Sequence, residues 1–337
     1  MSQRARIGVI GCGGMANSVH LPSLSDLENC ELVALCDLIE ERVDRACDKY
    51  HVPGRYTSYP EMLKCESLDG VVCLVEPDRM YRVVYDCLKA GVHVLMEKPA
   101  GINSYQADSL KRTADSSGKI LAVAMNRRHI PLVQYVFKKM KELTPITQID
   151  GVFIKSSDIA TGWHYMNAFI SDIIHAIDLI RYFAESEPDS VATVASRHNS
   201  PIDNAWSSII QFKNGITGTL KSNYQAGGRV HSFEIHGPKA SAFINLGFGD
   251  AACEATILHA SGQNIYSLAS EGVEGPSYEK IDGFTLAGSH EYYQYYGFKQ
   301  ENLDFIHCIL SGTEPLCTID DAAKSMHMAE LLLEKTI

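Results

Sequence analysis

Three small residues with a fixed spacing follow the first apolar run of the chain. The run Ile7–Ile10 leads directly into Gly11, Gly13 and Ala16, which is the G-x-G-x-x-A spacing of dinucleotide-binding turns. The first glycine permits a tight turn off a strand, and the second lets the backbone come close to a pyrophosphate. The small third residue lets the next helix pack closely on the strand, and the start of that helix offers free N–H groups to phosphates. The pattern predicts a dinucleotide site.

An acidic residue stands where such a site needs one. Glu31 and the apolar residues 32–36 predict the next strand, and Asp37 follows it. It lies about 20 residues after the glycines, where a carboxylate binds the ribose 2′-OH. Because a carboxylate repels a 2′-phosphate, we expect NAD to be preferred over NADP. Gly14 and Met15 lie in the same turn and are further expected contacts. The alternative is an ordinary strand–turn–helix with a chance acid, but the order of strand, glycines, helix and acid favours the cofactor.

Strand and helix patterns alternate through the first third of the chain. Strands are predicted over residues 5–10, 31–36, 68–75, 92–96 and 120–125, and those at 68–75 and 92–96 are expected to be buried. Helices are predicted from Met15 and over residues 40–50, 59–64, 79–90 and 103–116. Ser58 is the expected cap of the third helix, and Pro22 is expected to break or kink the first. This alternation implies the α/β class, with a doubly wound parallel sheet of Rossmann type.

The pattern changes near residue 126. Helices are predicted over 131–143 and 169–184, and strands over 149–156, 190–197, 207–212, 215–222, 231–237 and 240–246. Asn214-Gly215 predicts a tight hairpin, and consecutive hairpins imply an α+β domain with a largely antiparallel open sheet. We therefore expect a nucleotide-binding domain over residues 1–125 and an α+β domain over 126–315. A carboxy-terminal helix within 316–337 is expected to pack near the domain junction, and residues 247–290 show no readable pattern.

Composition limits the classes of partner. The chain has 337 residues, 45% of them apolar and 21% charged, with a net charge of −11. This charge argues against nucleic acid and anionic membranes as partners. No apolar run is long enough to span a membrane, and the chain enters a strand directly after Met1, so we expect no signal peptide.

The cysteines and histidines predict neither disulfides nor metal. Ten cysteines are scattered without a C-x-x-C pair, which favours a reducing, cytoplasmic location. Cys12, inside the glycine turn, is either a redox-sensitive thiol or a small filler, and the filler is favoured. No cluster has metal-ligand spacing, so we predict no metal.

Further motifs carry a family resemblance. Glu97-Lys98-Pro99 follows the strand at 92–96, Pro77 follows the strand at 68–75, and Asn126-Arg127-Arg128 stands at the predicted junction. With the glycine turn, Asp37 and the segment 171–182, the chain resembles the Gfo/Idh/MocA family (glucose-fructose oxidoreductase, inositol dehydrogenase and relatives). The resemblance implies reversible, NAD(P)-dependent oxidation of a sugar or polyol hydroxyl. It also implies that Pro77, Glu97, Lys98 and Asn126 contact the cofactor.

The residues suit this chemistry. A secondary alcohol must lose its O–H proton as hydride leaves for nicotinamide, which requires a base and a cation beside the developing alkoxide. His175, on a predicted helix, is suited to the first task, and Lys98, at the carboxyl edge of a parallel sheet, to the second. The alternatives are a surface lysine and a buried structural histidine. From the residues alone the two interpretations of His175 are balanced, and the resemblance favours the base.

Two neighbours of His175 compete as its partner. Asp172 lies three residues before it and Ser171 four residues before it, so on a continuous helix both share its face. Many family members have Asp at the position of Ser171, and this chain departs from that pattern. We favour Asp172 as the orienting carboxylate, with Ser171 as a weaker substrate contact. A second departure is Tyr81, where the family often has histidine near the nicotinamide.

Other residues are weaker substrate candidates. Trp163 could stack on a sugar ring and His164 could bind a hydroxyl, or Trp163 could anchor the junction. Arg127 and Arg128 could bind an anionic substrate, although bracing the junction is favoured. A tyrosine cluster over residues 292–296 lies at a cleft or an interface, and the sequence does not decide which.

The leading hypothesis is an NAD-dependent dehydrogenase of a sugar, sugar derivative or cyclic polyol. The alternatives are a redox-assisted lyase or glycosidase with transiently reduced, tightly bound NAD, and a non-catalytic sensor of NAD or sugar. Lys98 and His175 argue against the sensor. The apolar face of the strands over 190–246 predicts a homodimer or homotetramer. Substrate identity, stereochemistry and direction remain open.

Overall fold

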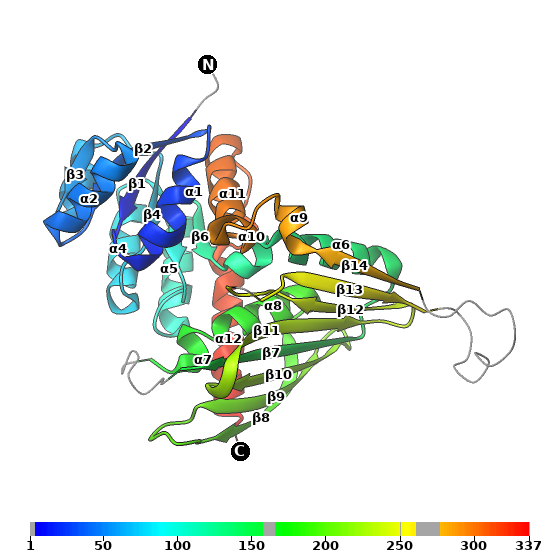
Figure 1. Cartoon of the computed structure of the whole chain (residues 1–337). Coiled ribbons are helices and arrows are strands. Elements are labelled where there is room, and N and C mark those ends of the chain that lie inside the picture. The colour runs from blue at the N-terminus through cyan, green and yellow to red at the C-terminus, as the bar shows by residue number, and fades with distance from the viewer. Residues whose placement is uncertain (1–3, 158–165, 250, 261–276, 337) are drawn as a thin grey trace, which may run out of the picture. The chain divides into compact units, whose positions relative to one another are not determined.

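The computed structural model describes residues 4–157, 166–249, 251–260 and 277–336. The chain divides into two units (Figure 1). Unit 1 comprises Met1–His129 and Glu291–His327, and unit 2 comprises Ile130–His290 and Met328–Ile337. The helix α12 (Ile319–Glu334) contributes residues to both.

Unit 1 is built on a six-stranded sheet in which every pairing is parallel. Its order is β3-β2-β1-β4-β5-β6. The strands are β1 (Ala5–Ile10), β2 (Cys30–Cys36), β3 (Gly54–Tyr56), β4 (Gly70–Cys73), β5 (His93–Glu97) and β6 (Leu121–Ala124). The strand order changes direction between β1 and β4, and ligands of doubly wound sheets bind at that point. The predicted Rossmann architecture is confirmed.

The helices of unit 1 follow the predicted order. They include α2 (Glu40–Tyr50), α3 (Tyr59–Cys65), α4 (Pro77–Lys89) and α5 (Ser104–Ser117). The Asn103 side chain accepts from the Gln106 N–H and caps α5, and Gly118 ends that helix in a left-handed conformation. Ser58 precedes α3 as expected, but its side chain makes no capping hydrogen bond.

The helix after the glycine turn is not broken at Pro22. A π-helical turn, η1 (Ala16–His20), continues directly into α1 (Leu21–Ser25), with Pro22 in the first turn of α1. Proline lacks an N–H, so the preceding helical turn must rearrange to accommodate it. The predicted break was wrong because the wider turn absorbs the proline, and the kink that was predicted as the other outcome stays a prediction.

A later segment joins unit 1. The helices α10 (Tyr292–Tyr295) and α11 (Phe298–Ser311) belong to it, and α11 packs on β1, β5 and α1. The first change of unit, after His129, lies close to the predicted boundary at 126, and residues 291–315 cluster with unit 1 rather than with unit 2. The reason is that buried side chains of α11, including Phe305 and Ile306, complete the core beneath the parallel sheet. The predicted domain boundaries stay a prediction.

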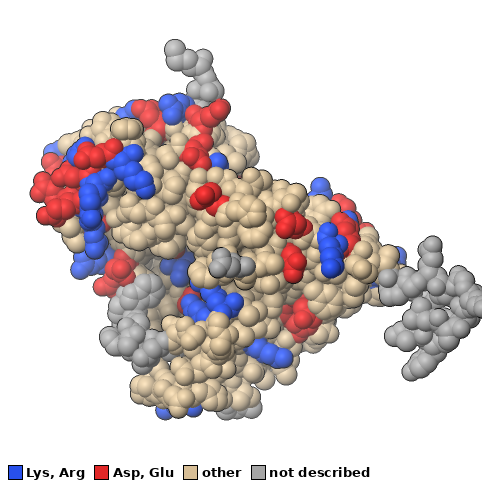
Figure 2. All heavy atoms as spheres, viewed as in Figure 1, with Lys and Arg blue, Asp and Glu red and all other residues tan. Residues whose placement is uncertain are grey.

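Charged side chains gather over one part of unit 1. Figure 2 shows red and blue atoms together over the region of α2 and β3. Arg55 accounts for part of this pattern, since it bridges Asp44 and Asp48 of α2. Exposed pairs of this kind are solvated and add little to stability.

Unit 2 is built on an eight-stranded sheet of order β14-β13-β12-β11-β7-β10-β9-β8 among the described residues. The strands are β7 (Gln148–Ser156), β8 (Pro188–Ser196), β9 (Ala205–Phe212), β10 (Thr217–Asn223), β11 (Gln225–His236), β12 (Ala240–Asn245), β13 (Glu254–His259) and β14 (Ser277–Asp282). The pairings are antiparallel except β7 with β10. The α+β prediction with a largely antiparallel sheet is confirmed.

Helices cover one face of this sheet. The helix α8 (Ile174–Ala184) packs on β7 and β10, and α6 (Pro131–Leu143) packs on β12 and β13. Strand residues alternate accordingly, so Phe153 and Phe233 are buried beneath the helices. Residues 247–290, which showed no pattern, contain β13, β14 and the short α9 (Gly283–Ala287).

Candidate functional site

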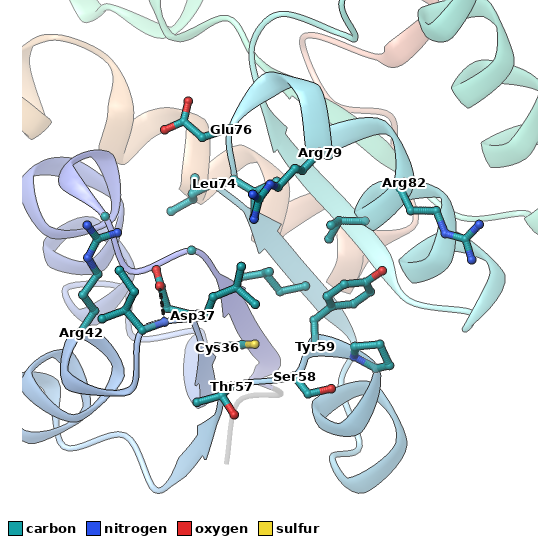
Figure 3. Close-up of a pocket in the computed structure, with 18 of the residues that line it drawn as sticks. Cys36, Asp37, Arg42, Thr57, Ser58, Tyr59, Leu74, Glu76, Arg79 and Arg82 are labelled. Carbon is teal, nitrogen blue, oxygen red and sulfur yellow. Dashed lines mark hydrogen bonds between the residues drawn. The ribbon is translucent and has the colours of Figure 1, made fainter.

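A cavity of about 810 Å³ opens at the carboxyl ends of β1, β2 and β4 in unit 1. Figure 3 shows side chains from several segments around it. Its lining includes Gly11, Gly13, Asp37, Leu38, Arg42 and Tyr59. This is the position where doubly wound sheets bind nucleotides, and the predicted glycine turn and Asp37 meet there.

The glycine turn is closely packed at Gly11 and leaves room for a ligand at Gly13 and Gly14. Gly11 has φ of +101°, and a Cβ there would stand 2.7 Å from the carbonyl oxygen of Leu74. At Gly13 and Gly14 a Cβ would meet nothing within 4 Å. Gly11 is therefore required by the fold, whereas Gly13 and Gly14 leave open space. Ala16 is fully buried in the core of unit 1, as its small size requires.

Asp37 ties the glycine turn to the end of β2. Its carboxylate accepts from the N–H of Cys12 at 2.8 Å and from the N–H of Ile39 at 2.9 Å, the latter drawn in Figure 3. Each carboxylate oxygen retains a further lone pair for a hydroxyl. Asp37 thus positions the glycine turn and presents its negative charge to the same cavity.

Positive and neutral groups complete the cavity wall. Arg42 and Arg79 line it, and neither has an ion-pair partner among the described residues, whereas Arg82 pairs with Asp86. Cys12 is buried, and burial raises the pKa of its thiol to about 12, with the Asp37 carboxylate adding to the shift. The thiol stays protonated, which supports its interpretation as a small filler.

These features fit a dinucleotide. The turn at Gly13 offers open space for a pyrophosphate, the Asp37 carboxylate offers acceptors for ribose hydroxyls, and Leu38 and Ile39 offer apolar contact for a base. Because acceptors, apolar walls and open space at the glycine turn surround one volume, the residues present suit NAD. Met15 lies in the same turn and is exposed.

Glu97 and Lys98 lie at the end of β5 in a buried network of unit 1. The Glu97 carboxylate accepts from the N–H of Lys98 at 3.0 Å and lies 3.3 Å from Nε2 of His20. Burial raises the pKa of Glu97, but the hydrogen bond from His20 and the charge of Lys98 outweigh it, so the net pKa falls. The peptide bond between Lys98 and Pro99 is cis. The network holds the strand end that carries Lys98.

A second buried carboxyl stands near this network. Glu301 of α11 is almost fully buried, and neither of its oxygens has a hydrogen-bond partner among the described residues. Burial, with the nearby carboxylates of Glu97 and Asp304, raises its pKa well above the usual range. The sequence offered no signal for either His20 or Glu301, because each lies far along the chain from Glu97.

The remaining predicted residues of unit 1 are mostly structural in their contacts. Pro77 is the first residue of α4. The Asn126 amide donates to the carbonyl of Tyr296 at 2.8 Å, and Arg127 lies over the Tyr296 ring at 5.7 Å. The Tyr81 hydroxyl shares a hydrogen bond with the Ser109 hydroxyl at 2.9 Å.

Arg128 and the tyrosine cluster are also internal to unit 1. Arg128 is buried and pairs with Asp321 of α12. The rings of Tyr292 and Tyr296 stack 4.9 Å apart, and Tyr296 is buried. Tyr295 and Tyr296 are buried beside α11, whereas Tyr292 and Tyr293 are half-buried. The contacts of Arg128 and Tyr296 support a bracing role.

In unit 2, the predicted helix 169–184 is interrupted. The short helix α7 (Ala168–Ser171) ends at Asp172, which has φ of −138° and ψ of −50°, and α8 begins at Ile174. The prediction of one continuous helix was wrong, so the shared-face argument for Asp172 and His175 does not apply as stated. Their connection instead runs through the backbone, where the His175 N–H donates to the Asp172 carbonyl at 3.3 Å.

The Asp172 carboxylate has partners that sequence spacing did not indicate. The Tyr224 hydroxyl donates to it at 2.7 Å, and the Lys155 ammonium forms an ion pair with it. Both partners come from sheet strands or their ends, far from Asp172 along the chain. His175 and Ser171 are both buried near the amino-terminal end of α8. Trp163 and His164 lie outside the described residues.

One group of metal-type ligands occurs in the described part of the chain. Asp150 of β7 and Glu234 and His236 of β11 place their ligand atoms within 4.8 Å of one another. The His236 imidazole lies 3.2 Å from the Glu234 carboxylate, an ion-pair geometry that needs no metal. The sequence prediction of no metal therefore stays a prediction.

Two findings, on helix length and on the cysteines, bear on the predictions from composition. Over the described residues, no helix has both the length and the apolar character that crossing a membrane requires. All ten cysteines are free thiols.

Comparison with known proteins relates these features to a family. Residues 5–125 match an oxidoreductase family with an NAD-binding Rossmann fold, named GFO_IDH_MocA, and residues 141–243 match a GFO/IDH/MocA C-terminal domain.

Relatives of known name are distant. Over 231 residues the chain is 26% identical to D-apiose dehydrogenase from Paraburkholderia graminis, an alignment that spans 66% of this chain and 61% of that protein. It is 27% identical over 256 residues to myo-inositol 2-dehydrogenase from Thermotoga maritima, spanning 71% of this chain and 75% of that protein.

A solved structure shares the fold over nearly the whole chain. UDP-N-acetylglucosamine 3-dehydrogenase from Acidithiobacillus ferrooxidans aligns with a TM-score of 0.83 at 19% identity, covering 99% of this chain and 98% of that one. With both family domains matched in order, this chain belongs to the Gfo/Idh/MocA family of oxidoreductases with an NAD-binding Rossmann domain.

Proposed function

We propose that this protein is an NAD-dependent dehydrogenase that oxidises a secondary hydroxyl of a sugar, sugar derivative or cyclic polyol. The observation that carries the proposal is the cavity of unit 1, where the glycine turn and Asp37 line one volume suited to a dinucleotide. The named relatives, D-apiose dehydrogenase and myo-inositol 2-dehydrogenase, support the substrate class.

The bound cofactor would supply one chemical capability, the acceptance of a hydride at nicotinamide. The chain's residues must then remove a proton and stabilise the oxygen that loses it. We assign the proton to the His175 imidazole, whose backbone N–H is tied to Asp172 at the start of α8. We assign stabilisation of the oxygen to the Lys98 ammonium, carried by the strand end that Glu97 holds.

The cofactor preference rests on charge. The Asp37 carboxylate accepts two backbone N–H groups, which fixes its position and keeps a negative charge at the cavity wall. A 2′-phosphate placed there would be repelled, so we propose that NAD is preferred over NADP. Arg42 and Arg79 line the same cavity and lessen this repulsion without removing its cause.

One assay tests the proposal. Purified protein is mixed with NAD or NADP and a panel of sugars and cyclic polyols, and absorbance of the reduced cofactor is followed. The expected result is net accumulation of NADH with at least one panel member and a higher kcat/KM for NAD than for NADP. Substrate turnover without NADH would support the redox-assisted lyase, and cofactor binding without any turnover would support a sensor. Either result would contradict the proposal that this protein is a dehydrogenase.

The proposed assembly is a homodimer or homotetramer through the face of the unit 2 sheet opposite α6 and α8. Large apolar side chains on that face are exposed, including Val194, Ile209, Val230, Phe243 and Leu258. Apolar patches of this kind mark interaction surfaces. We further propose a cytoplasmic location, in keeping with the free cysteines.

A further inference from the structure

We infer that the substrate of unit 2 carries an anionic substituent, a carboxylate or a phosphate, which is held by Arg229 and Lys155 beside Asp172. This inference rests on the proposed function, since it concerns the substrate of the same site. It narrows the substrate class from neutral sugars and polyols to sugar acids or sugar phosphates.

Two cations stand opposite each other in a strand ladder. Arg229 of β11 pairs directly with Lys155 of β7 in the antiparallel register, and Phe153 pairs with His231 two residues further along. Side chains two residues apart on a strand lie on the same face of a sheet, so both cations share the face of the buried Phe153, on which the helices pack. Opposite positions of a ladder bring side chains close together, and like charges placed there repel each other. The fold therefore concentrates positive charge at this point of the sheet.

Only one of these two cations has a carboxylate partner in the described part of the chain. Lys155 pairs with the Asp172 carboxylate. Arg229 has no ion-pair partner among the described residues, and its buried Nε has no hydrogen-bond partner there. Among the described residues, the Arg229 guanidinium is therefore a positive charge without a paired carboxylate. A substrate anion would balance that charge and satisfy the guanidinium.

The backbone around Arg229 gives its side chain a fixed direction. The ladder between β11 and β7 shifts register between Gln225 and Arg229, and this irregular stretch contains Gly228 in a left-handed conformation. The Arg229 guanidinium lies over the Phe248 ring, 3.6 Å from its centroid. A bulge re-aims a side chain, and a ring beneath a guanidinium fixes its plane while leaving N–H groups at its edge for an anion.

The place of this pair relative to the proposed chemistry favours a substrate over a distant effector. Lys155 contacts the Asp172 carboxylate, and the Asp172 carbonyl accepts from the N–H of His175. An anion held between Lys155 and Arg229 would therefore lie on the same part of unit 2 as the proposed base. The rest of the substrate molecule would carry the hydroxyl to be oxidised.

The test compares matched substrates on the full chain. Uronates, aldonates and sugar phosphates are each assayed with NAD beside the neutral sugar or polyol of the same stereochemistry, and binding is measured in parallel by calorimetry. We expect the wild-type protein to prefer an anionic compound over its neutral counterpart by about ten-fold or more in kcat/KM, as for a charge-assisted contact. Whether the uronates, the aldonates or the phosphates show this preference identifies the anion.

Variants of Arg229 test whether its guanidinium causes the preference for anionic over neutral substrates. Arg229→Gln should lower the preference for the anion by about ten-fold or more, mainly through KM, and Arg229→Lys should restore part of it because it restores the charge. Arg197→Gln is the matched control, because Arg197 is an exposed arginine of unit 2 whose partner is Asp203. Thermal melting checks that each variant is folded.

Two results would overturn the inference. One is a wild-type preference for the neutral compounds, and the other is an equal effect of Arg229→Gln on anionic and neutral members of each pair. Failure of the proposed dehydrogenase is a separate outcome. If no compound is oxidised, binding of anions that depends on Arg229 still supports the subsite, and binding that is independent of Arg229 or absent overturns it.

Discussion

At the scale of single residues, the proposed chemistry depends most on Lys98. Its backbone N–H donates to the Glu97 carboxylate, which also lies within hydrogen-bond distance of the His20 imidazole. This arrangement fixes where the side chain leaves the strand. The ammonium itself is the group that the proposal assigns to the developing alkoxide.

Lys98→Met should therefore lower kcat by roughly 100-fold or more, the range for loss of a positioned catalytic group, while the affinity for NAD stays within a few-fold. Steady-state kinetics and calorimetry with NAD measure the two effects. Lys138→Met, at an exposed lysine of α6, is the control. Turnover within a few-fold of wild type in Lys98→Met would refute the assignment.

Glu301 gives a prediction for pH. Burial and two nearby carboxylates raise its pKa in the folded protein, so folding favours its protonated form. The resulting stability is fully present below the pKa of the unfolded chain, roughly 4.3, and is lost as pH rises toward the raised folded value. The wild-type protein should therefore lose stability from this group between these two values.

Glu301→Gln removes the titration and keeps the shape. We expect the melting temperature of the variant, relative to that of the wild type, to increase as pH rises from about 5.5 to about 8.5. The increase should be a few degrees for each ~1 kcal/mol of difference in the free energy of unfolding. Glu314→Gln, at an exposed position, should show a constant difference from wild type. A pH-independent difference for Glu301→Gln would contradict the prediction.

At the scale of elements, two glycines of the glycine turn have different roles, one in the fold and one at the proposed binding cavity. Gly11 has positive φ and faces the Leu74 carbonyl, whereas Gly13 borders open space at the cavity. Alanine is therefore strained at the first position by the protein itself. At the second position alanine would meet only a bound ligand.

Gly11→Ala should lower both the melting temperature and the affinity for NAD, with a cost of about 1–3 kcal/mol for the strained backbone. Gly13→Ala should leave the melting temperature near wild type and lower only the affinity. Differential scanning calorimetry and NAD titration measure the pair. Equal effects of the two variants on stability would show that the turn is not divided in this way.

The break between α7 and α8 is a second feature at the scale of elements, and it determines which side chains Asp172 contacts. It places Asp172 outside the helix, where its carboxylate meets Lys155 and Tyr224 rather than lying along a helical stripe. The carboxylate therefore neutralises a cation as well as standing near His175 in the chain. Ser171, the last residue of α7, has no equivalent charge to supply.

Asp172→Asn should accordingly reduce kcat/KM by about ten-fold or more, because Lys155 loses its charged partner and the surroundings of His175 change. Ser171→Ala should reduce it by a few-fold at most, and Tyr224→Phe should fall between them. Kinetics on all three variants with one substrate measure the order. A larger loss in Ser171→Ala than in Asp172→Asn would reverse the assignment.

At the scale of the whole molecule, the face of the unit 2 sheet opposite α6 and α8 predicts assembly. Ile209 of β9 is 64% exposed on that face, although isoleucine is usually buried. Ile209→Lys should shift the protein toward monomer in sedimentation velocity at a concentration where the wild type is a dimer or tetramer. Tyr105→Lys, at an exposed apolar position of α5 in unit 1, should leave the assembly unchanged. A monomeric wild type would refute the proposal.

The sequence by itself determined the features that depend on neighbours along the chain. Strand and helix periodicity, the glycine spacing and the place of Asp37 after β2 are local, and each reappears in the structure, apart from the helix interruption at 172–173. The same holds for Asn214-Gly215, since the hairpin between β9 and β10 is set by the preference of glycine for positive φ. The family resemblance rested on Glu97-Lys98-Pro99 in combination with the glycine turn, Asp37 and the segment 171–182, because each of these is a short stretch of chain.

Only the tertiary structure decided which distant side chains meet. His20 approaches Glu97, and Lys155 and Tyr224 approach Asp172, across separations that no sequence period encodes. Likewise α11 joins unit 1 although it follows unit 2 in the chain, because its apolar side chains fill a core that the first 129 residues leave open. Such contacts result from packing and burial, which depend on the whole fold rather than on spacing along the chain.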